Sequence, residues 1–121
     1  MESNPPSIYA LAWIEKFNKK KVELEKFRQK LFELAKQLTI ILKREYHATE
    51  VYLIGSIASD RLISFDSDID LVVKGLPEKE YFSILTKLYH FLPSGVNLDL
   101  ITFESAEESL QKRAIDEGIL L

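Results

Sequence analysis

Two short apolar runs flank a polar loop in the middle of the chain, and this arrangement constrains the fold more than any other feature. The first run, residues 51–54, ends at Gly55-Ser56, and Asp68 and Asp70 lead into the second run, residues 71–73. The strands that contain these runs are expected over residues 50–54 and 69–74. Both runs are rich in β-branched or aromatic residues and are bounded by turn formers, which predicts two buried strands. The polar loop between them therefore lies at one end of a sheet.

Helical periodicity dominates the N-terminal part of the chain. Apolar residues recur at three- and four-residue spacing from Leu24 to Ile41, which predicts a long helix whose stripe faces either the core or a partner. Ser7 is a candidate cap for an earlier helix that begins near Ile8. Neither Gly nor Pro separates the two segments, so they form one continuous helix or bend near Asn18.

The remaining segments alternate between helix and strand. The expected elements are a short helix within residues 56–64, a helix over 78–91, a strand over 96–103, and a closing helix over 104–117 with Leu110 and Ile115 turned inward. An alternation of this kind predicts an α/β sheet covered by helices. At 121 residues the chain is one domain by length, with residues 1–45 as a helical extension and residues 46–121 as the core.

Composition excludes several kinds of site. The chain has no cysteine, which excludes disulfides and thiolate chemistry, and only two histidines, too few for a histidine-rich metal site. No apolar run approaches the length of a membrane span, and the first residues do not resemble a signal peptide. A cytoplasmic protein without membrane contact is expected.

Charge is unevenly spread along the chain. Residues 16–45 hold ten Lys or Arg and four Glu, although the net charge of the whole chain is −3. This basic segment is either a solvated helix face or a surface for an acidic partner, RNA or nucleotide. Direct nucleic-acid binding is the weakest of these hypotheses, because glutamates interrupt the basic residues and no exposed aromatics are evident for base stacking.

Three aspartates define the candidate chemistry. Asp68 and Asp70 are two residues apart, so on a strand they face the same side. Asp99 lies in the third expected strand and reaches the same place if the two strands are neighbours. Carboxylates together with substrate phosphates are typical ligands of Mg²⁺, and three of them could hold two ions. The Gly55-Ser56 turn would let the backbone approach a phosphate closely.

At Gly55-Ser56, Asp68-Ile69-Asp70 and Asp99, and in the string SDIDL, the chain resembles the minimal nucleotidyltransferases of the polymerase-β superfamily. The resemblance covers roughly residues 50–121. It implies a small mixed β-sheet covered by helices, two Mg²⁺ ions and ATP as the nucleotide donor. It also implies that Asp68, Asp70 and Asp99 are the catalytic metal ligands.

By the same resemblance, Gly55, Ser56 and Ser67 contribute to nucleotide binding. The chain departs from the family motif G-S-x-A-R-G, because Ser59-Asp60 stands where members often have Arg-Gly. Arg61 could supply the missing positive charge from a shifted position.

Small members of this superfamily are often antitoxins that are paired with a helical HEPN ribonuclease. The resemblance implies that such an antitoxin transfers AMP from ATP to a toxin hydroxyl, expected on a tyrosine, and so neutralises the toxin. The alternative is a weakly active or inactive antitoxin that binds the toxin and occludes it. In that case the stripe from Leu24 to Ile41 is the expected contact surface.

Overall fold

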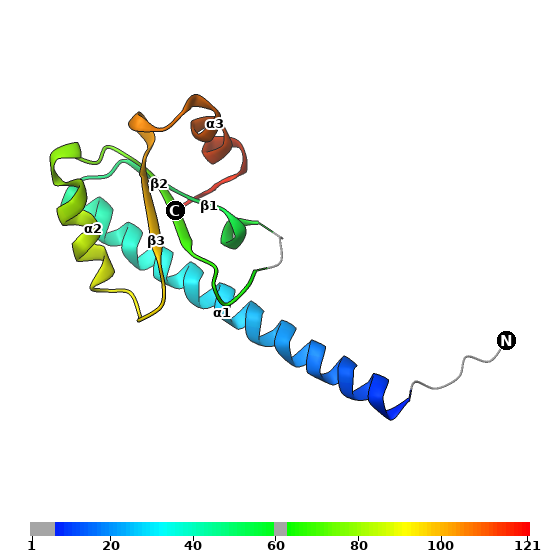
Figure 1. Cartoon of the computed structure of the whole chain (residues 1–121). Helices are drawn as coiled ribbons and strands as arrows, with labels where there is room; N and C mark the ends of the chain where they lie inside the picture. Colours follow the sequence, from blue (N-terminus) through cyan, green and yellow to red (C-terminus); the bar gives the residue numbers. More distant parts are fainter. Residues whose placement is uncertain (1–6, 60–62) are drawn as a thin grey trace.

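A four-stranded sheet packed against one long helix forms the body of the protein in the computed structural model, which describes residues 7–59 and 63–121 (Figure 1). The α-helices are α1 (Ile8–Tyr46), α2 (Tyr81–Tyr89) and α3 (Glu108–Glu117). The strands are β1 (Glu50–Ile54), β2 (Ile69–Lys74), β3 (Leu98–Thr102) and β4 (Ile119–Leu120). Short 3₁₀ turns are η1 (Ser56–Ala58), η2 (Glu78–Glu80) and η3 (Phe103–Ser105).

The sheet is mixed, as the resemblance implied. Its strand order is β3-β2-β1-β4, with β1 antiparallel to both β2 and β4, and β2 parallel to β3. The parallel pair is connected through α2, as parallel neighbours require a crossover. Strand β4 was not predicted, because two residues carry no recognisable alternation.

Alternation along the strands sorts their side chains onto two faces. One face carries Leu53 and Leu71, which pack with Leu31 of α1 in the main core. The opposite face carries Val72, which packs with Ala114 of α3 in a smaller cluster. Helices α1 and α2 therefore cover one face of the sheet and α3 covers part of the other, which leaves one end of the α3 face open.

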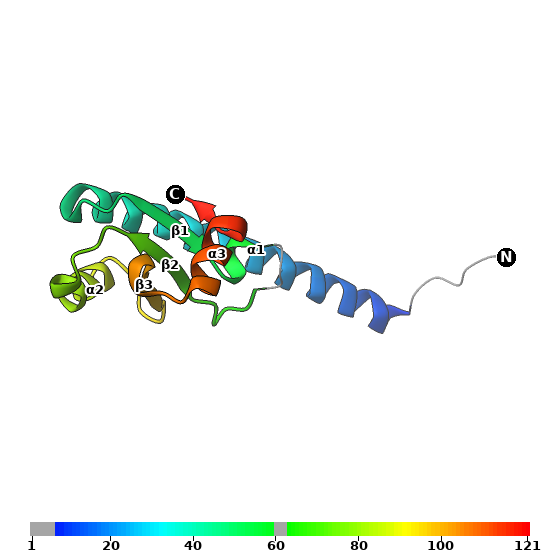
Figure 2. The same ribbon diagram turned by 90° about the horizontal axis from the view of Figure 1, so that it is seen from above.

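Helix α1 is continuous, and the sheet covers only its second half. The Ser7 hydroxyl accepts a hydrogen bond from the Ala10 backbone N–H at 3.1 Å, so the predicted cap is confirmed. Leu31, Leu38 and other stripe residues are buried, so the stripe faces the core, and the expectation that it is a contact surface for the toxin is wrong. Residues 11–23, in contrast, are all exposed, and this part of the helix projects beyond the body of the protein (Figures 1 and 2).

Two helix predictions need correction. Only the turn η1 forms within the described part of residues 56–64, because Gly55 and Arg28 fix a tight reversal there, and residues 60–62 lie outside the described part. The closing helix begins at Glu108 rather than at residue 104. Ile115 is 53% exposed, since Ala114 occupies the inward position. None of the described helices is both long and apolar enough to cross a membrane.

Candidate active site

Two of the three predicted aspartates lie side by side at the open end of the sheet. Asp70 of β2 is the register partner of Asp99 on the parallel strand β3, so both side chains lie on the face that α3 partly covers. Asp68 precedes β2 by one residue and is exposed, as is Asp99. The expectation that the two strands are neighbours is confirmed.

Asp70 is the most perturbed carboxyl group of this cluster. Burial raises its pKa from 3.8 to about 6, and the negative charges of Asp99 and Asp68 add to the rise. The positive charge of Arg113 acts in the opposite direction. A half-buried carboxylate with two anionic neighbours is a place where a bound cation would be stabilising, and perturbed groups of this kind cluster at functional sites.

Gly55 brings the chain directly against this carboxyl group. Gly55 directly follows Ile54, which is the last residue of β1 and the register partner of Asp70. The φ angle of Gly55 is +83°. A Cβ atom at Gly55 would collide with Oδ2 of Asp70. The backbone conformation therefore favours glycine here, and any side chain at this position would also have to displace the Asp70 carboxylate.

Helix α1 holds the turn that follows Gly55. The Arg28 guanidinium donates to the carbonyl oxygens of Ser56, at 3.0 Å, and of Ser59. The Ala58 N–H donates to the Gly55 carbonyl at 3.2 Å, which closes the turn locally. The candidate phosphate-binding turn is thus fixed to the body of the protein by a cation on a neighbouring element.

The loop before Asp68 is also supported from α1. Phe65 packs on Phe27 of α1 with ring centroids 5.4 Å apart. The Ser67 hydroxyl accepts a hydrogen bond from the Ser64 N–H at 3.0 Å, so in this structure it stabilises the loop. Arg61, the residue expected to supply a positive charge, lies outside the described residues.

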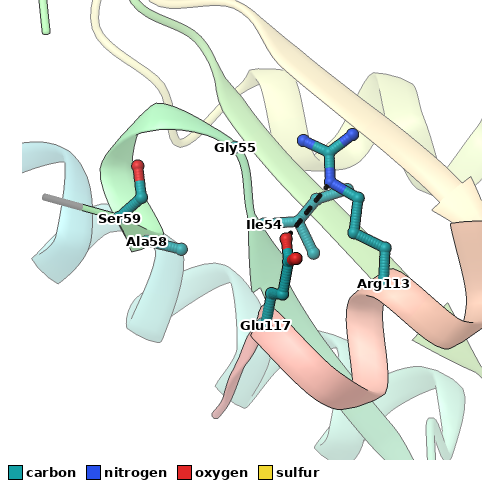
Figure 3. A pocket seen from close by; sticks show the side chains of 7 residues that line it. Ile54, Gly55, Ala58, Ser59, Arg113 and Glu117 are labelled. Atoms are coloured by element: carbon teal, nitrogen blue, oxygen red, sulfur yellow. Dashed lines mark ion pairs between the residues drawn. The ribbon is translucent and has the colours of Figure 1, made fainter. Parts of the chain in front are cut away.

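A small cavity beside Gly55 carries a cation that sequence reasoning did not identify. Arg113 of α3 lines it together with Gly55 and Ser59, and Figure 3 shows the Arg113 side chain extending from the helix. Its Nε lies 3.8 Å from a Glu117 carboxylate oxygen, an exposed and weak ion pair. Since the Arg113 charge is felt by Asp70, this guanidinium also lies within electrostatic reach of the aspartate cluster.

The donor set fits a magnesium–nucleotide in its chemistry. Asp68, Asp70 and Asp99 offer the oxygen ligands that Mg²⁺ prefers, and the excess negative charge at Asp70 calls for a cation. Within the described ranges, no three Asp, Glu or His side chains converge closely enough to hold a metal ion as they stand. Binding would therefore require the exposed side chains of Asp68 and Asp99 to turn toward Asp70.

Arg28 and Arg113 are thus the site-facing residues that the sequence did not indicate. Arg28 was one of many cations in a basic helix, and its position opposite the Gly55 turn depends on how α1 crosses the sheet. Arg113 lies in the closing helix, where no motif marked it. Only the packing of these helices on the sheet places Arg28 at the turn after Gly55 and Arg113 within electrostatic reach of Asp70.

Comparison with known proteins identifies the family. Residues 36–121 match the sequence model of the family described as polymerase beta, nucleotidyltransferase. No curated protein sequence gave a significant match.

Solved structures share the fold. A minimal nucleotidyltransferase is 25% identical with a TM-score of 0.59, over 81% of this chain and 95% of that one. A toxin–antitoxin structure with AMP-PNP is also 25% identical, with a TM-score of 0.57 over 69% of each chain. The toxin–antitoxin MntA–HepT is 21% identical, with a TM-score of 0.53 over 72% of this chain and 68% of that one.

The family match covers most of the chain, and it includes Gly55, Ser56 and all three aspartates. The mixed four-stranded sheet with its helices agrees with this family. The chain therefore belongs to the polymerase-β nucleotidyltransferase family.

Proposed function

We propose that this protein is a Mg²⁺-dependent antitoxin that transfers AMP from ATP to a tyrosine hydroxyl group of a HEPN ribonuclease toxin and so neutralises the toxin. The observation that carries the proposal is the pairing of Asp70 with Asp99 beside Gly55. The pairing places carboxylates and a close-approach turn at one end of the sheet, and such a combination suits a metal-bound triphosphate.

The donor and the acceptor follow from different observations. ATP is proposed as the donor from the family resemblance, and a similar toxin–antitoxin structure holds AMP-PNP. A protein acceptor is proposed because two of the similar structures are toxin–antitoxin pairs. A tyrosine hydroxyl is the proposed acceptor group, which the acceptor protein would present at the open end of the sheet.

In the proposed reaction the acceptor oxygen attacks the α-phosphorus of ATP. The bond from that phosphorus to its bridging oxygen breaks, and pyrophosphate leaves. Asp68, Asp70 and Asp99 would hold the metal, and Asp99 would also take up the acceptor proton. Bound Mg²⁺ supplies charge neutralisation at the phosphates and activation of the attacking oxygen. The Gly55 turn binds the phosphate side, and Arg28 keeps that turn in place.

A second candidate function is neutralisation by binding alone. It is favoured by the observation that the described carboxylates do not converge into a ready metal site. In this case the protein would occlude the toxin, and substitution of the aspartates would leave neutralisation intact.

The two candidates separate in one experiment. The purified protein is incubated with Mg²⁺, α-phosphate-labelled ATP and a HEPN ribonuclease encoded beside it. Transfer predicts label on the ribonuclease, and loss of label when Asp68 and Asp70 are both replaced by Asn. Asp66→Asn is the matched control, because Asp66 is an exposed aspartate of the same loop and should retain transfer. If the ribonuclease is inhibited in the mixture but carries no label, the result favours occlusion.

A further inference from the structure

The first half of α1 exposes more apolar surface than a helix in water normally does. Ile8, Tyr9 and Trp13 are 84%, 83% and 72% exposed, and Phe17 is 68% exposed, so the expectation of no exposed aromatics beside the basic segment is wrong. This N-terminal arm, residues 8–23, projects beyond the sheet (Figures 1 and 2). Contiguous exposed apolar residues of this kind mark an interaction surface.

The aromatic residues of the arm continue the face that packs on the sheet. Eighteen residues make about five turns of an α-helix. Trp13 therefore lies on the same side of α1 as Leu31, and Phe17 on the same side as Ala35. Leu31 and Ala35 are fully buried. Tyr9, Trp13 and Phe17 thus form a stripe, at spacings of four residues, that continues the buried face of α1 but is not covered by the sheet.

Charge next to the stripe restricts what can cover it. Residues 15–30 hold seven Lys or Arg and three Glu. Within the described part of the chain, the ion pair in this segment joins Arg28 to Glu25, and Lys16 lies over the Trp13 ring at 5.8 Å. Two arms packed in parallel would bring their lysines together, which is unfavourable. A surface with carboxylates beside apolar groups is complementary.

The shape of the apolar surface also restricts the partner. Ile8, Leu11 and Ile14 are exposed on other sides of the arm, so apolar groups surround much of it. A helix that is apolar on most sides is normally enclosed by protein rather than laid on a flat surface. A groove between helices, with apolar walls and acidic edges, matches this requirement.

We propose that the N-terminal arm is a docking element for a helical protein whose apolar groove is edged by carboxylates. The identification of that protein with the acceptor of the transfer reaction rests on the proposed function. The family match begins at residue 36, so the arm lies outside it. The arm would hold the partner while the aspartates, on a separate part of the protein, act on it.

Trp13 gives a direct measurement, because it is the only tryptophan of the chain. The full-length protein is titrated with a synthetic two-helix peptide whose leucine stripes line a groove between the helices and whose groove edges carry glutamates. The same peptide with lysine at each glutamate position is the charge control. Binding of the Glu peptide should shift Trp13 emission to the blue. A higher salt concentration should weaken this binding. The Lys peptide should bind far less.

Variants separate the stripe from the rest of the helix. Phe17→Ala should weaken binding of the Glu peptide by about tenfold or more, as expected for a central aromatic contact. Ile40→Ala is the matched control, since Ile40 is 49% exposed and lies outside the arm, in the second half of α1. Circular dichroism of both variants should match that of the parent protein.

Four results would overturn the proposal. Two concern the peptides: no emission shift with either peptide, or equal shifts with both. The third is a dimer of the protein alone in sedimentation, with Trp13 emission already shifted to the blue. The fourth is a larger emission shift with phosphatidylglycerol vesicles than with the Glu peptide. The dimer result would assign the arm to a second copy, and the vesicle result to a lipid surface. Neither ATP nor transfer enters the experiment, so its failure is distinguishable from failure of the proposed reaction.

Discussion

Replacing Asp70 by Asn is expected to stabilise the fold while it removes the proposed chemistry. In the folded protein the pKa of Asp70 is raised from 3.8 to about 6 by burial and by the charges of Asp99 and Asp68. The unfolded chain therefore releases this proton at lower pH than the folded protein does. Between these two values the ionised carboxylate becomes progressively unfavourable for folding.

The magnitude follows from the size of the rise. A rise from 3.8 to about 6 corresponds to about 3 kcal/mol of destabilisation once the group is ionised in both states. Asp70 is only half buried, and solvent screening reduces this to about 1–2 kcal/mol. The penalty is absent below the unfolded pKa, grows as pH rises through the interval, and is complete above about pH 6.

The assay is urea or thermal unfolding of the parent protein and the variant at pH 4.5 and pH 8. The stability gained by Asp70→Asn should be larger at pH 8 by about 1 kcal/mol, a difference in Tm of roughly 4 °C. Asp66→Asn, which removes an exposed carboxylate of the same loop, is the control for the loss of one surface charge. If the variant gains the same stability at both pH values, or is less stable than the parent at pH 8, Asp70 is not a carboxylate whose ionisation destabilises the fold.

Magnesium provides a second test of the same residue. A cation bound at Asp70 stabilises the folded state by mass action, by about 1.4 kcal/mol when its concentration is ten times the dissociation constant. Mg²⁺ with AMP-PNP should therefore raise the Tm of the parent protein and of Asp66→Asn, and should raise that of Asp70→Asn much less. Sodium chloride at equal ionic strength is the control for screening.

Three further substitutions test the elements around the aspartates. Gly55→Ala should lower the free energy of unfolding by about 2 kcal/mol or more, because it combines a positive φ with a collision at Asp70. Gly95→Ala shares the positive φ but meets open space, so a urea titration should show a smaller loss of stability. Arg28→Ala should lower kcat/KM for ATP by releasing the Gly55 turn, and Lys30→Ala, one half-turn away and exposed, should not. Arg113→Gln should raise KM for ATP and raise the pKa of Asp70, whereas Lys112→Gln should change neither, as followed by steady-state kinetics and pH titration.

The local parts of the fold were predictable from sequence because they depend on local patterns. The strands 50–54 and 69–74 were predicted with the observed bounds, since each is a short apolar run between turn residues. The α1 stripe was predicted from its period. Strand β4 and the inward position of Ala114 were not, because they depend on where the closing helix crosses the sheet.

The candidate site divides in the same way. Gly55 and the three aspartates could be chosen because residue type and spacing indicate their chemistry. The contact between Gly55 and Asp70 depends on strand register. The raised pKa of Asp70 depends on its burial and its charged neighbours. Arg28 reaches its turn from 28 residues away along the chain, a distance at which no sequence pattern operates.

The measurement that tests the central claim most directly is the intact mass of a partner HEPN ribonuclease after incubation with this protein, ATP and Mg²⁺. The account predicts a mass increase by one or more AMP units, retained with Asp66→Asn and lost with Asp70→Asn. Ribonuclease inhibition without any mass increase, or an increase that persists with Asp70→Asn, would contradict it.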